Sequence, residues 1–362
     1  MTQRVHNFSA GPSALPLAVL EAARRDLSDF NGTGMSIMEM SHRSQTYDEV
    51  HNQAIADLKA LMGMDDSWDV LFMGGGARTQ FALLPMNLLP EDGLGTYITT
   101  GKWSEGALSE ANKIGHAEEL WTSKETGHDR VPAPGEVAPK ASSTYLHYTS
   151  NNTIYGTQFH HTPDSGDALL LCDMSSDILS RQVEVDKFSV IYAGAQKNMG
   201  PAGVTVVFLR RDLLEHSPAD LPETMSYQKM GSKNSLLNTP PVFPIYMVGL
   251  VARHLVEQGG LDTIAAANVQ KAELLYRAID NSGGFYRGHA QPDSRSRMNV
   301  TFRLPDEELE SAFLSESGEL GMNGLKGHRS VGGLRASIYN AVPLDAVTAL
   351  VDFMDDFKRR RG

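Results

Sequence analysis

Residues 192–203 read Tyr192-Ala-Gly-Ala-Gln-Lys-Asn-Met-Gly-Pro-Ala-Gly203, and the rest of the chain can be arranged around this stretch. The apolar run Phe188–Tyr192 leads into it and a second apolar run, Val204–Leu209, follows, so Lys197 is predicted to lie in a turn between two strands. The small residues around Lys197 leave room for a flat, bulky group. A lysine amine held where water is scarce becomes a nucleophile suited to Schiff-base chemistry. The alternative is a solvated lysine at a loop tip, and the choice between these two interpretations depends on other residues of the chain.

The composition excludes several classes of function. The chain has 362 residues, of which 41% are hydrophobic and 21% charged, which is typical of a globular protein with one large and one smaller domain. A net charge of −12 argues against a nucleic-acid partner. We expect no membrane segment, because no apolar run approaches about 18 residues. The single cysteine, Cys172, and the absence of a signal-peptide pattern favour a cytoplasmic location.

A glycine-rich turn joins a strand to a helix early in the chain. Val70–Met73 is a continuous apolar run, Gly74-Gly-Gly-Ala-Arg78 follows it, and a helix is predicted from Thr79 towards Leu89. Free backbone N–H groups at the start of a helix attract anions, and glycines let a phosphate come close. The sequence lacks both the P-loop ending and the spaced dinucleotide fingerprint. A phosphate cradle and a simple tight connection therefore both remain open.

Two further residues stand at the ends of predicted strands. The apolar run Ala168–Cys172 ends at Asp173, and a carboxylate there is costly unless a cation, a bound ion or strong hydrogen bonds compensate it. Trp103 follows the strand pattern that begins at Thr96, and we expect it in a loop where its ring could stack on a flat ligand or fill the core. No histidine and carboxylate cluster lies near Asp173 in the sequence, so we predict no metal.

Taken together, these signals fit one cofactor. A Schiff-base lysine, a carboxylate at a strand end, a phosphate-binding turn and a ring-stacking tryptophan are the contacts that pyridoxal 5′-phosphate requires. After residue 238 the pattern changes to long helices and a few alternating strands, which indicates a small α+β domain. Within it, residues 327–335 place His328, Arg329 and Arg335 among flexible glycines.

Separate motifs along the whole chain resemble those of the phosphoserine aminotransferases, a class V, fold-type I family of pyridoxal-phosphate enzymes. The motifs are Asn7-Phe-Ser-Ala-Gly-Pro12, Ser41-His-Arg43, Gly74-Gly-Gly76, Thr100-Gly-Lys-Trp-Ser104, Asn152-Thr-Ile-Tyr-Gly156, Asp173-Met-Ser-Ser176, Gly194-Ala-Gln-Lys-Asn198, Asn238-Thr-Pro-Pro241, Gly327-His-Arg329 and Arg335-Ala-Ser-Ile-Tyr-Asn340. The resemblance implies an α/β fold whose large domain has a mostly parallel seven-stranded sheet flanked by helices. It also implies an N-terminal arm (1–15) that packs with the small domain, a large cofactor domain (16–257) and a small C-terminal domain (258–362).

The resemblance also implies roles for residues at the cofactor. Lys197 would form the Schiff base and carry the proton between substrate and cofactor, and Asp173 would keep the pyridine nitrogen protonated. Trp103 would stack on the ring and Thr153 would bind its 3-oxygen. The phosphate would be held by Ala77, Arg78 and Gln196, and by Asn238 and Thr239 from the neighbouring subunit of a homodimer. Two departures bear on this assignment: Arg78 comes one residue later than in some members, leaving the choice among Ala77, Arg78 and Thr79 open, and Tyr155 stands where other members carry an acid or histidine.

The implied reaction is a reversible ping-pong transamination in L-serine biosynthesis. O-phospho-L-serine and 2-oxoglutarate would give 3-phosphohydroxypyruvate and L-glutamate, with 4-phosphohydroxy-L-threonine of pyridoxine biosynthesis as a further substrate. In the family, Arg335 takes the α-carboxylate, and the distal phosphate or γ-carboxylate is surrounded by His42, Arg43, His328 and Arg329. The alternative is another class V enzyme, an alanine–glyoxylate type aminotransferase or a cysteine desulfurase. A desulfurase needs a mobile cysteine, whereas Cys172 lies inside an apolar strand pattern.

Overall fold

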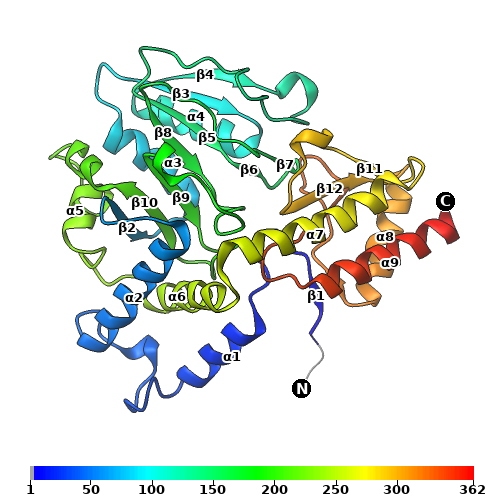
Figure 1. The fold of residues 1–362 in the computed structure, drawn as a ribbon, viewed down its shortest axis with the longest axis horizontal. Helices are drawn as coiled ribbons and strands as arrows, with labels where there is room; N and C mark the ends of the chain where they lie inside the picture. The colour runs from blue at the N-terminus through cyan, green and yellow to red at the C-terminus, as the bar shows by residue number, and fades with distance from the viewer. Residues whose placement is uncertain (1–3) are drawn as a thin grey trace.

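The protein is built around a seven-stranded sheet, as a computed structural model that describes residues 4–362 shows. The strands, in spatial order, are β2 (Trp68–Met73), β10 (Thr205–Arg210), β9 (Val190–Gly194), β8 (Leu169–Asp173), β5 (Tyr145–Thr149), β3 (Leu94–Thr99) and β4 (His116–Thr122). Strand β10 runs antiparallel to β2 and β9, and the other neighbouring pairs are parallel (Figure 1). The predicted α/β class with a mostly parallel seven-stranded sheet is therefore confirmed.

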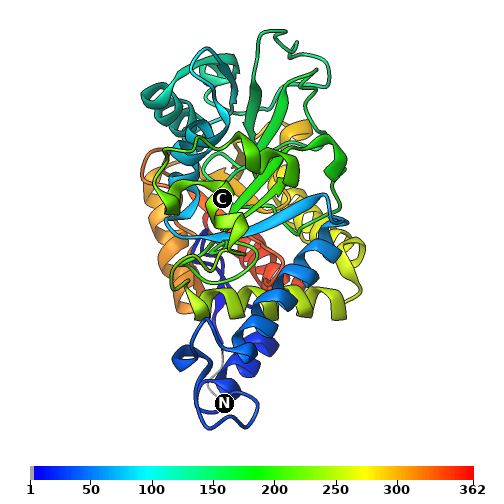
Figure 2. The ribbon, with the colours of Figure 1, turned by 90° about the vertical axis from the view of Figure 1, so that its left-hand side faces the viewer.

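Helices cover both faces of this sheet, which is why its strands read as continuous apolar runs. On one face, Val206 and Cys172 belong to a core that includes residues of α2 (Gln45–Met62) and α6 (Val242–Glu257). On the other face, Leu171 packs in a core with α3 (Gly76–Leu88), α4 (Lys102–Ile114) and the short α5 (Tyr227–Ser232). Figure 2 shows α1 (Leu17–Asp26) and the loop that follows it projecting beyond α6 at one end of the molecule.

The C-terminal part has its own sheet and core. Strands β11 (Arg287–Gly288), β12 (Asn299–Arg303) and β14 (Leu334–Ser337) are antiparallel and pack with α7 (Gly260–Asp280), α8 (Glu307–Glu319) and α9 (Leu344–Arg361). Strand β1 (His6–Asn7) pairs in parallel with β13 (Met322–Asn323), so the N-terminal segment joins this part. Two short strands, β6 (Asn151–Asn152) and β7 (Thr157–Gln158), form a hairpin at the junction.

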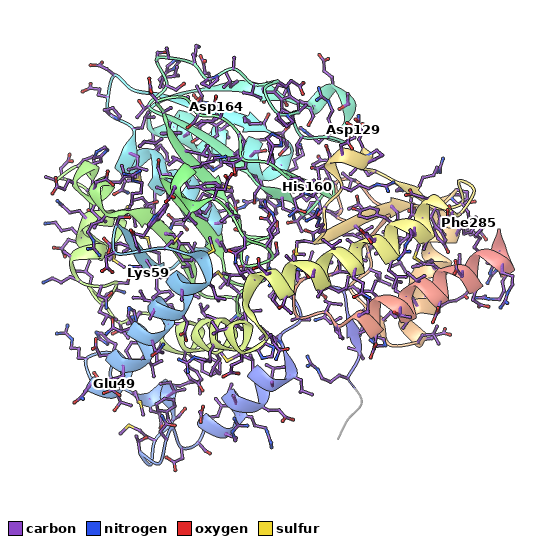
Figure 3. All side chains as sticks on the ribbon, viewed as in Figure 1. Glu49, Lys59, Asp129, His160, Asp164 and Phe285 are labelled. Atoms are coloured by element: carbon purple, nitrogen blue, oxygen red, sulfur yellow. The ribbon has the colours of Figure 1, made fainter. Side chains whose placement is uncertain are left out.

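The two parts are tied together by polar contacts along their boundary. Gln291 donates from its backbone N–H to Asp129 O at 2.8 Å and from its side chain to Asp129 Oδ2 at 2.9 Å. His160 Nε2 lies 2.9 Å from Arg295 O, and Figure 3 shows Asp129 and His160 at this boundary. Helix α7 crosses it, since Leu261 packs in the large core and Leu275 in the small one. The division of the chain at 257/258 therefore stays a prediction.

The region after β3 differs from what the sequence pattern indicated. The sequence pattern predicts Trp103 in a loop, but Trp103 lies in the first turn of α4, which begins directly after Gly101 with φ 150°. That helix was not predicted, because polar residues surround Ala107 and Ala111, its apolar positions that pack in the core against the sheet. Strand β4 was not predicted either. Residues 1–3 of the predicted N-terminal arm lie outside the described part of the chain. Within residues 4–362, no helix has the length and apolar character needed to cross a membrane.

Candidate active site

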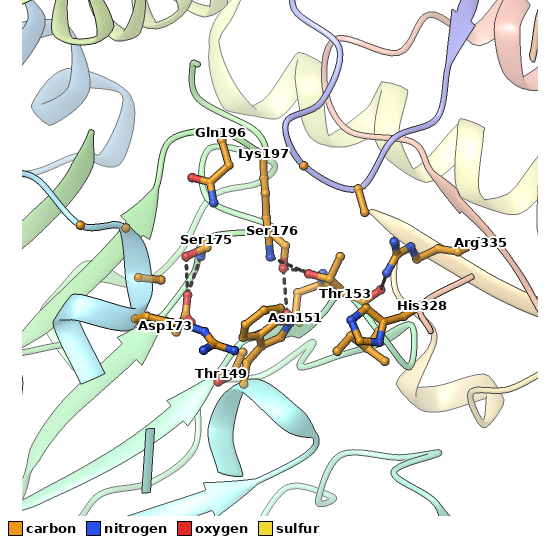
Figure 4. Close-up of a pocket in the computed structure, with 18 residues that line it drawn as sticks. Thr149, Asn151, Thr153, Asp173, Ser175, Ser176, Gln196, Lys197, His328 and Arg335 are labelled. Atoms are coloured by element: carbon orange, nitrogen blue, oxygen red, sulfur yellow. Dashed lines mark hydrogen bonds between the residues drawn. The ribbon is translucent and has the colours of Figure 1, made fainter. Parts of the chain in front are cut away.

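A cavity of about 360 Å³ opens where strands of the large sheet end and the small domain begins. Asp173 ends β8 and Thr149 ends β5, while Lys197 follows β9 in the turn before β10. The carboxyl ends of strands in an open α/β sheet are the usual place for a ligand. Eighteen residues line the cavity (Figure 4): Ala10, Gly11, Gly75, Gly76, Ala77, Arg78, Trp103, Thr149, Asn151, Thr153, Ile154, Asp173, Ser175, Ser176, Gln196, Lys197, His328 and Arg335.

Lys197 points into this cavity with its amine close to a hydroxyl group. Its Nζ donates to Thr153 Oγ1 at 2.7 Å and lies 5.6 Å from the centre of the Trp103 ring (Figure 4). Burial lowers the pKa of Lys197 to about 8, although the Asp173 carboxylate opposes this shift. The neutral form of the amine is therefore far more accessible here than at an ordinary lysine. The turn that carries Lys197 is also bound to the N-terminal segment, because the backbone N–H of Ser13 donates to Gln196 O at 3.0 Å.

Asp173 is a buried carboxylate that hydrogen bonds, rather than a salt bridge, hold in place. Its side chain is only 4% exposed, and Oδ1 accepts the backbone N–H of Ser175 at 2.9 Å and its hydroxyl at 2.6 Å (Figure 4). Burial raises the pKa of Asp173, while Lys197 and the two bonds from Ser175 lower it. The charge of the nearby Lys197 and the strong hydrogen bonds from Ser175 thus compensate this carboxylate at a strand end.

The glycine-rich turn has the backbone shape of an anion cradle. Gly75 and Gly76 adopt φ values of 88° and 71°, in the left-handed region that favours glycine, and α3 begins directly after Gly75. A Cβ at Gly75 would lie 1.9 Å from Thr79 Oγ1, so a side chain does not fit there. Ala77 and Arg78, in the first turn of α3, line the cavity, and the Arg78 guanidinium lies 5.6 Å from the Trp103 ring centre. The first N–H groups of a helix have no partner within it, so the start of α3, which lines the cavity, is suited to bind a phosphate.

Arg335 and His328 of the small domain close the opposite wall. Arg335, in β14, donates from Nη1 to Thr153 O at 3.2 Å, while its buried Nε has no partner among the described residues. His328 lies in the loop before β14, and burial together with the neighbouring Arg335 and Arg329 lowers its pKa. Arg335 therefore keeps donors free for a carboxylate.

Nine of the fourteen residues predicted for the site line this cavity, and five do not. The nine are Ala77, Arg78, Trp103, Thr153, Asp173, Gln196, Lys197, His328 and Arg335. Outside it, Asn238 and Thr239 are exposed, Arg329 is exposed beside His328, and His42 and Arg43 line a separate surface cavity. The roles of all fourteen stay predictions, but their placement divides them into one group around Lys197 and another on the surface.

The cavity also contains residues that sequence reasoning passed over. Ser175 and Ser176 follow Asp173, Thr149 and Asn151 flank the end of β5, and Ala10 and Gly11 come from the N-terminal segment. The two serines were visible in the Asp173 motif, but their hydroxyl partners were not. Nothing in the local sequence around Thr149 points to a cavity, because its position depends on which strands become neighbours.

The donor set fits pyridoxal phosphate. Buried polar atoms without a partner among the described residues include Thr149 Oγ1, Trp103 Nε1 and Arg335 Nε, and the glycine turn is open on the cavity side. One amine, one carboxylate and one aromatic ring converge with this anion cradle, as the cofactor's aldehyde, ring nitrogen, ring face and phosphate require. Within residues 4–362, no group of three His, Cys, Asp or Glu side chains is arranged to hold a metal ion.

Comparisons with known proteins agree with this geometry. The family model Aminotransferase class-V matches residues 5–350. A curated phosphoserine aminotransferase of Geobacillus kaustophilus is 54% identical over 358 residues, covering 99% of each chain. The solved phosphoserine aminotransferase of Bacillus circulans subsp. alkalophilus is 53% identical, with a TM-score of 0.97 over 99% of each chain. A phosphoserine aminotransferase of Trichomonas vaginalis, solved with bound pyridoxal phosphate, is 36% identical with a TM-score of 0.91, covering 97% of this chain and 100% of that one.

Proposed function

The chain belongs to the class V aminotransferase family, and from this premise we propose how its residues carry out a transamination with pyridoxal phosphate. The reaction is the reversible exchange of the amino group between O-phospho-L-serine and 2-oxoglutarate, giving 3-phosphohydroxypyruvate and L-glutamate, as in serine biosynthesis. The observation that carries the assignment is the convergence of Lys197, Asp173 and the glycine turn on one cavity in a chain that matches these aminotransferases over its full length.

When bound, the cofactor supplies an aldehyde that combines with amines and a ring that takes up electrons from the substrate's α-carbon. Lys197 provides the amine that holds it and moves the proton at the substrate's Cα, a task that suits an amine whose pKa is lowered to about 8. Asp173 holds the proton on the ring nitrogen, and Trp103 stacks on the ring. Thr153, which accepts from Lys197 in this structure, binds the ring's 3-oxygen.

Substrate binding is assigned to the cationic residues. Arg335 binds the α-carboxylate that all four substrates share, with its guanidinium held against Thr153 O. The distal phosphate or γ-carboxylate is bound by His328 and Arg329 of the same chain and by His42 and Arg43. Because guanidinium groups pair with phosphate and carboxylate alike, one subsite serves both half-reactions. The longer 4-phosphohydroxy-L-threonine has the same two anionic ends, so we include it as a second amino donor.

We further propose a homodimer with shared active sites. His42 and Arg43 line a surface cavity together with Lys233, and this cavity lies next to the segment that leads to the exposed Asn238 and Thr239. Residues with predicted roles at the cofactor or substrate are thus gathered on the surface, away from the cavity of their own chain. A second copy that places its cavity against this surface would complete both sites. A cytoplasmic location is part of this proposal. The single cysteine, Cys172, is buried and unpaired, which fits a reducing compartment.

The alternative activities fit less well. A cysteine desulfurase needs a mobile, reactive thiol, but Cys172 is 0% exposed within β8 and burial raises its pKa well above the usual value. An alanine–glyoxylate aminotransferase of Nostoc sp. has the same fold at 14% identity, which speaks for the architecture alone.

Reduction of the purified protein tests the assignment directly. The protein should be yellow, and borohydride should fix pyridoxal phosphate to Lys197, as peptide mass spectrometry would show. With phosphoserine and 2-oxoglutarate it should form glutamate, and Lys197→Ala should still bind the cofactor but lose at least about 10³-fold in turnover. A colourless protein that takes up no cofactor, or a Lys197→Ala variant with normal turnover, would refute the proposal.

A further inference from the structure

The carboxylate of Asp173 is held on one side by a residue without an assigned role. Ser175 donates to Asp173 Oδ1 twice, from its backbone N–H at 2.9 Å and from its hydroxyl at 2.6 Å. Both residues are buried, with exposed fractions of 4%. Figure 4 shows the two bonds reaching the same oxygen.

The direction of the hydroxyl bond follows from a third contact. Gly194, the last residue of β9, donates its backbone N–H to Ser175 Oγ at 3.0 Å. A backbone N–H can only donate, so Ser175 Oγ must accept there. A hydroxyl has one proton, and here it is directed to Asp173 Oδ1. The serine therefore acts as a fixed donor towards the carboxylate, oriented by the neighbouring strand.

This arrangement gives the two carboxylate oxygens of Asp173 different numbers of hydrogen bonds. Oδ1 accepts two hydrogen bonds, whereas Oδ2 accepts none from the described residues. We propose that Ser175 is a positioning residue, which keeps Asp173 ionised and turns its free oxygen, Oδ2, towards the ring nitrogen of the cofactor. The proposal rests on the proposed function, because it needs a cofactor whose ring nitrogen meets Asp173.

Two physical reasons indicate that losing the Ser175 hydroxyl has a substantial effect on the Asp173 carboxylate. Hydrogen bonds to an ionised group are stronger than those between neutral groups, and they matter most where burial disfavours the charge. Burial raises the pKa of Asp173, and Ser175 opposes that shift. Without the hydroxyl, the carboxylate would lose a donor and Gly194 N–H would lose its acceptor. The ion pair with the ring nitrogen would then weaken.

The test compares two cofactors that differ only at the ring nitrogen. Apoprotein of the wild type and of Ser175→Ala is titrated with pyridoxal phosphate and with its 1-deaza analogue, and dissociation constants are read from tryptophan quenching. We expect Ser175→Ala to bind pyridoxal phosphate about 10- to 100-fold more weakly, the range of one hydrogen bond to a charged group. The deaza analogue should bind both proteins within about threefold, because it has no nitrogen for Asp173 to hold.

A matched control separates positioning from loss of structure. Ser189 Oγ accepts the backbone N–H of Leu170 at 3.2 Å, so Ser189→Ala removes a similar bond in the same sheet away from the cavity. It should leave both dissociation constants unchanged, and Ser175→Thr, which keeps the hydroxyl, should restore most of the affinity. Equal losses for both cofactors in Ser175→Ala would overturn the positioning role. Wild-type apoprotein that binds neither compound would instead overturn the proposed function.

Discussion

At the scale of single residues, one cavity shifts two pKa values that would otherwise lie far apart. Burial disfavours charge on both Lys197 and Asp173, so it lowers the pKa of the lysine and raises that of the carboxylate. Their mutual attraction opposes both shifts. The result for Lys197 is a pKa of about 8, low enough for an appreciable neutral fraction at neutral pH.

This pKa predicts how the apoprotein captures its cofactor. Only the neutral amine attacks an aldehyde, and with a pKa of about 8 roughly 10% of Lys197 is neutral at pH 7, against under about 0.1% for an ordinary lysine. The capture rate in stopped-flow absorbance should therefore rise about tenfold per pH unit below pH 8 and level off above it. A rate that keeps rising tenfold per unit beyond pH 9 would show that the cavity does not lower this pKa.

At the scale of elements, the turn between β2 and α3 depends on backbone shape. Gly75 and Gly76 both have positive φ, but they differ in the space around them. A Cβ at Gly75 would overlap Thr79, whereas a Cβ at Gly76 would meet no atom within 4 Å. The first glycine is therefore required by both conformation and packing, and the second by conformation alone.

The two glycines make a matched pair for a stability measurement. In the apoprotein, Gly76→Ala should lower the free energy of unfolding by about 1 to 2 kcal/mol, the cost of a left-handed residue with a side chain. Gly75→Ala should cost about 1 to 3 kcal/mol more, because Thr79 has to move. Denaturant unfolding without cofactor gives both values. Equal losses would mean that the contact with Thr79 relaxes freely.

At the scale of the whole molecule, the arrangement of the predicted residues argues for shared sites. His42 and Arg43 face one surface cavity, with Asn238 and Thr239 exposed further along the chain that borders it. The cavity around Lys197 includes none of these four. We therefore assign one group of residues to the chain's own cofactor and the other group to a second copy.

Subunit mixing tests this assignment. Lys197→Ala and the double variant Asn238→Ala/Thr239→Ala should each be nearly inactive alone. After joint unfolding and refolding, mixed dimers contain one site with a native lysine and native partner residues, so activity should recover to about a quarter of the wild type. Each variant refolded alone is the control. If the mixture shows only the average of the two, each site is complete within one chain and the shared-site proposal is wrong.

The fold and much of the site could be predicted from local patterns. Strands β8, β9 and β10 appear as apolar runs because both sheet faces are covered, and the glycines before α3 mark a turn that only they permit. Helix α4 could not be recognised in this way, since its buried positions are Ser104 and two alanines among polar residues. Its prediction would have required knowing that Trp103 lies in the first turn of a helix rather than in a loop.

The sequence by itself determined which groups the candidate site offers: an amine at Lys197, a carboxylate at Asp173, and a glycine-rich turn at Gly74–Gly76. These groups depend on residue type and on neighbours along the chain, so they can be recognised from the sequence without knowledge of the fold. Only the tertiary structure decided which atoms meet. Ser175 faces Asp173 and Gly194 because β8 and β9 lie side by side, and Arg335 reaches Thr153 because β14 packs against the large domain. Such contacts depend on strand order and domain packing, which residue spacing does not specify.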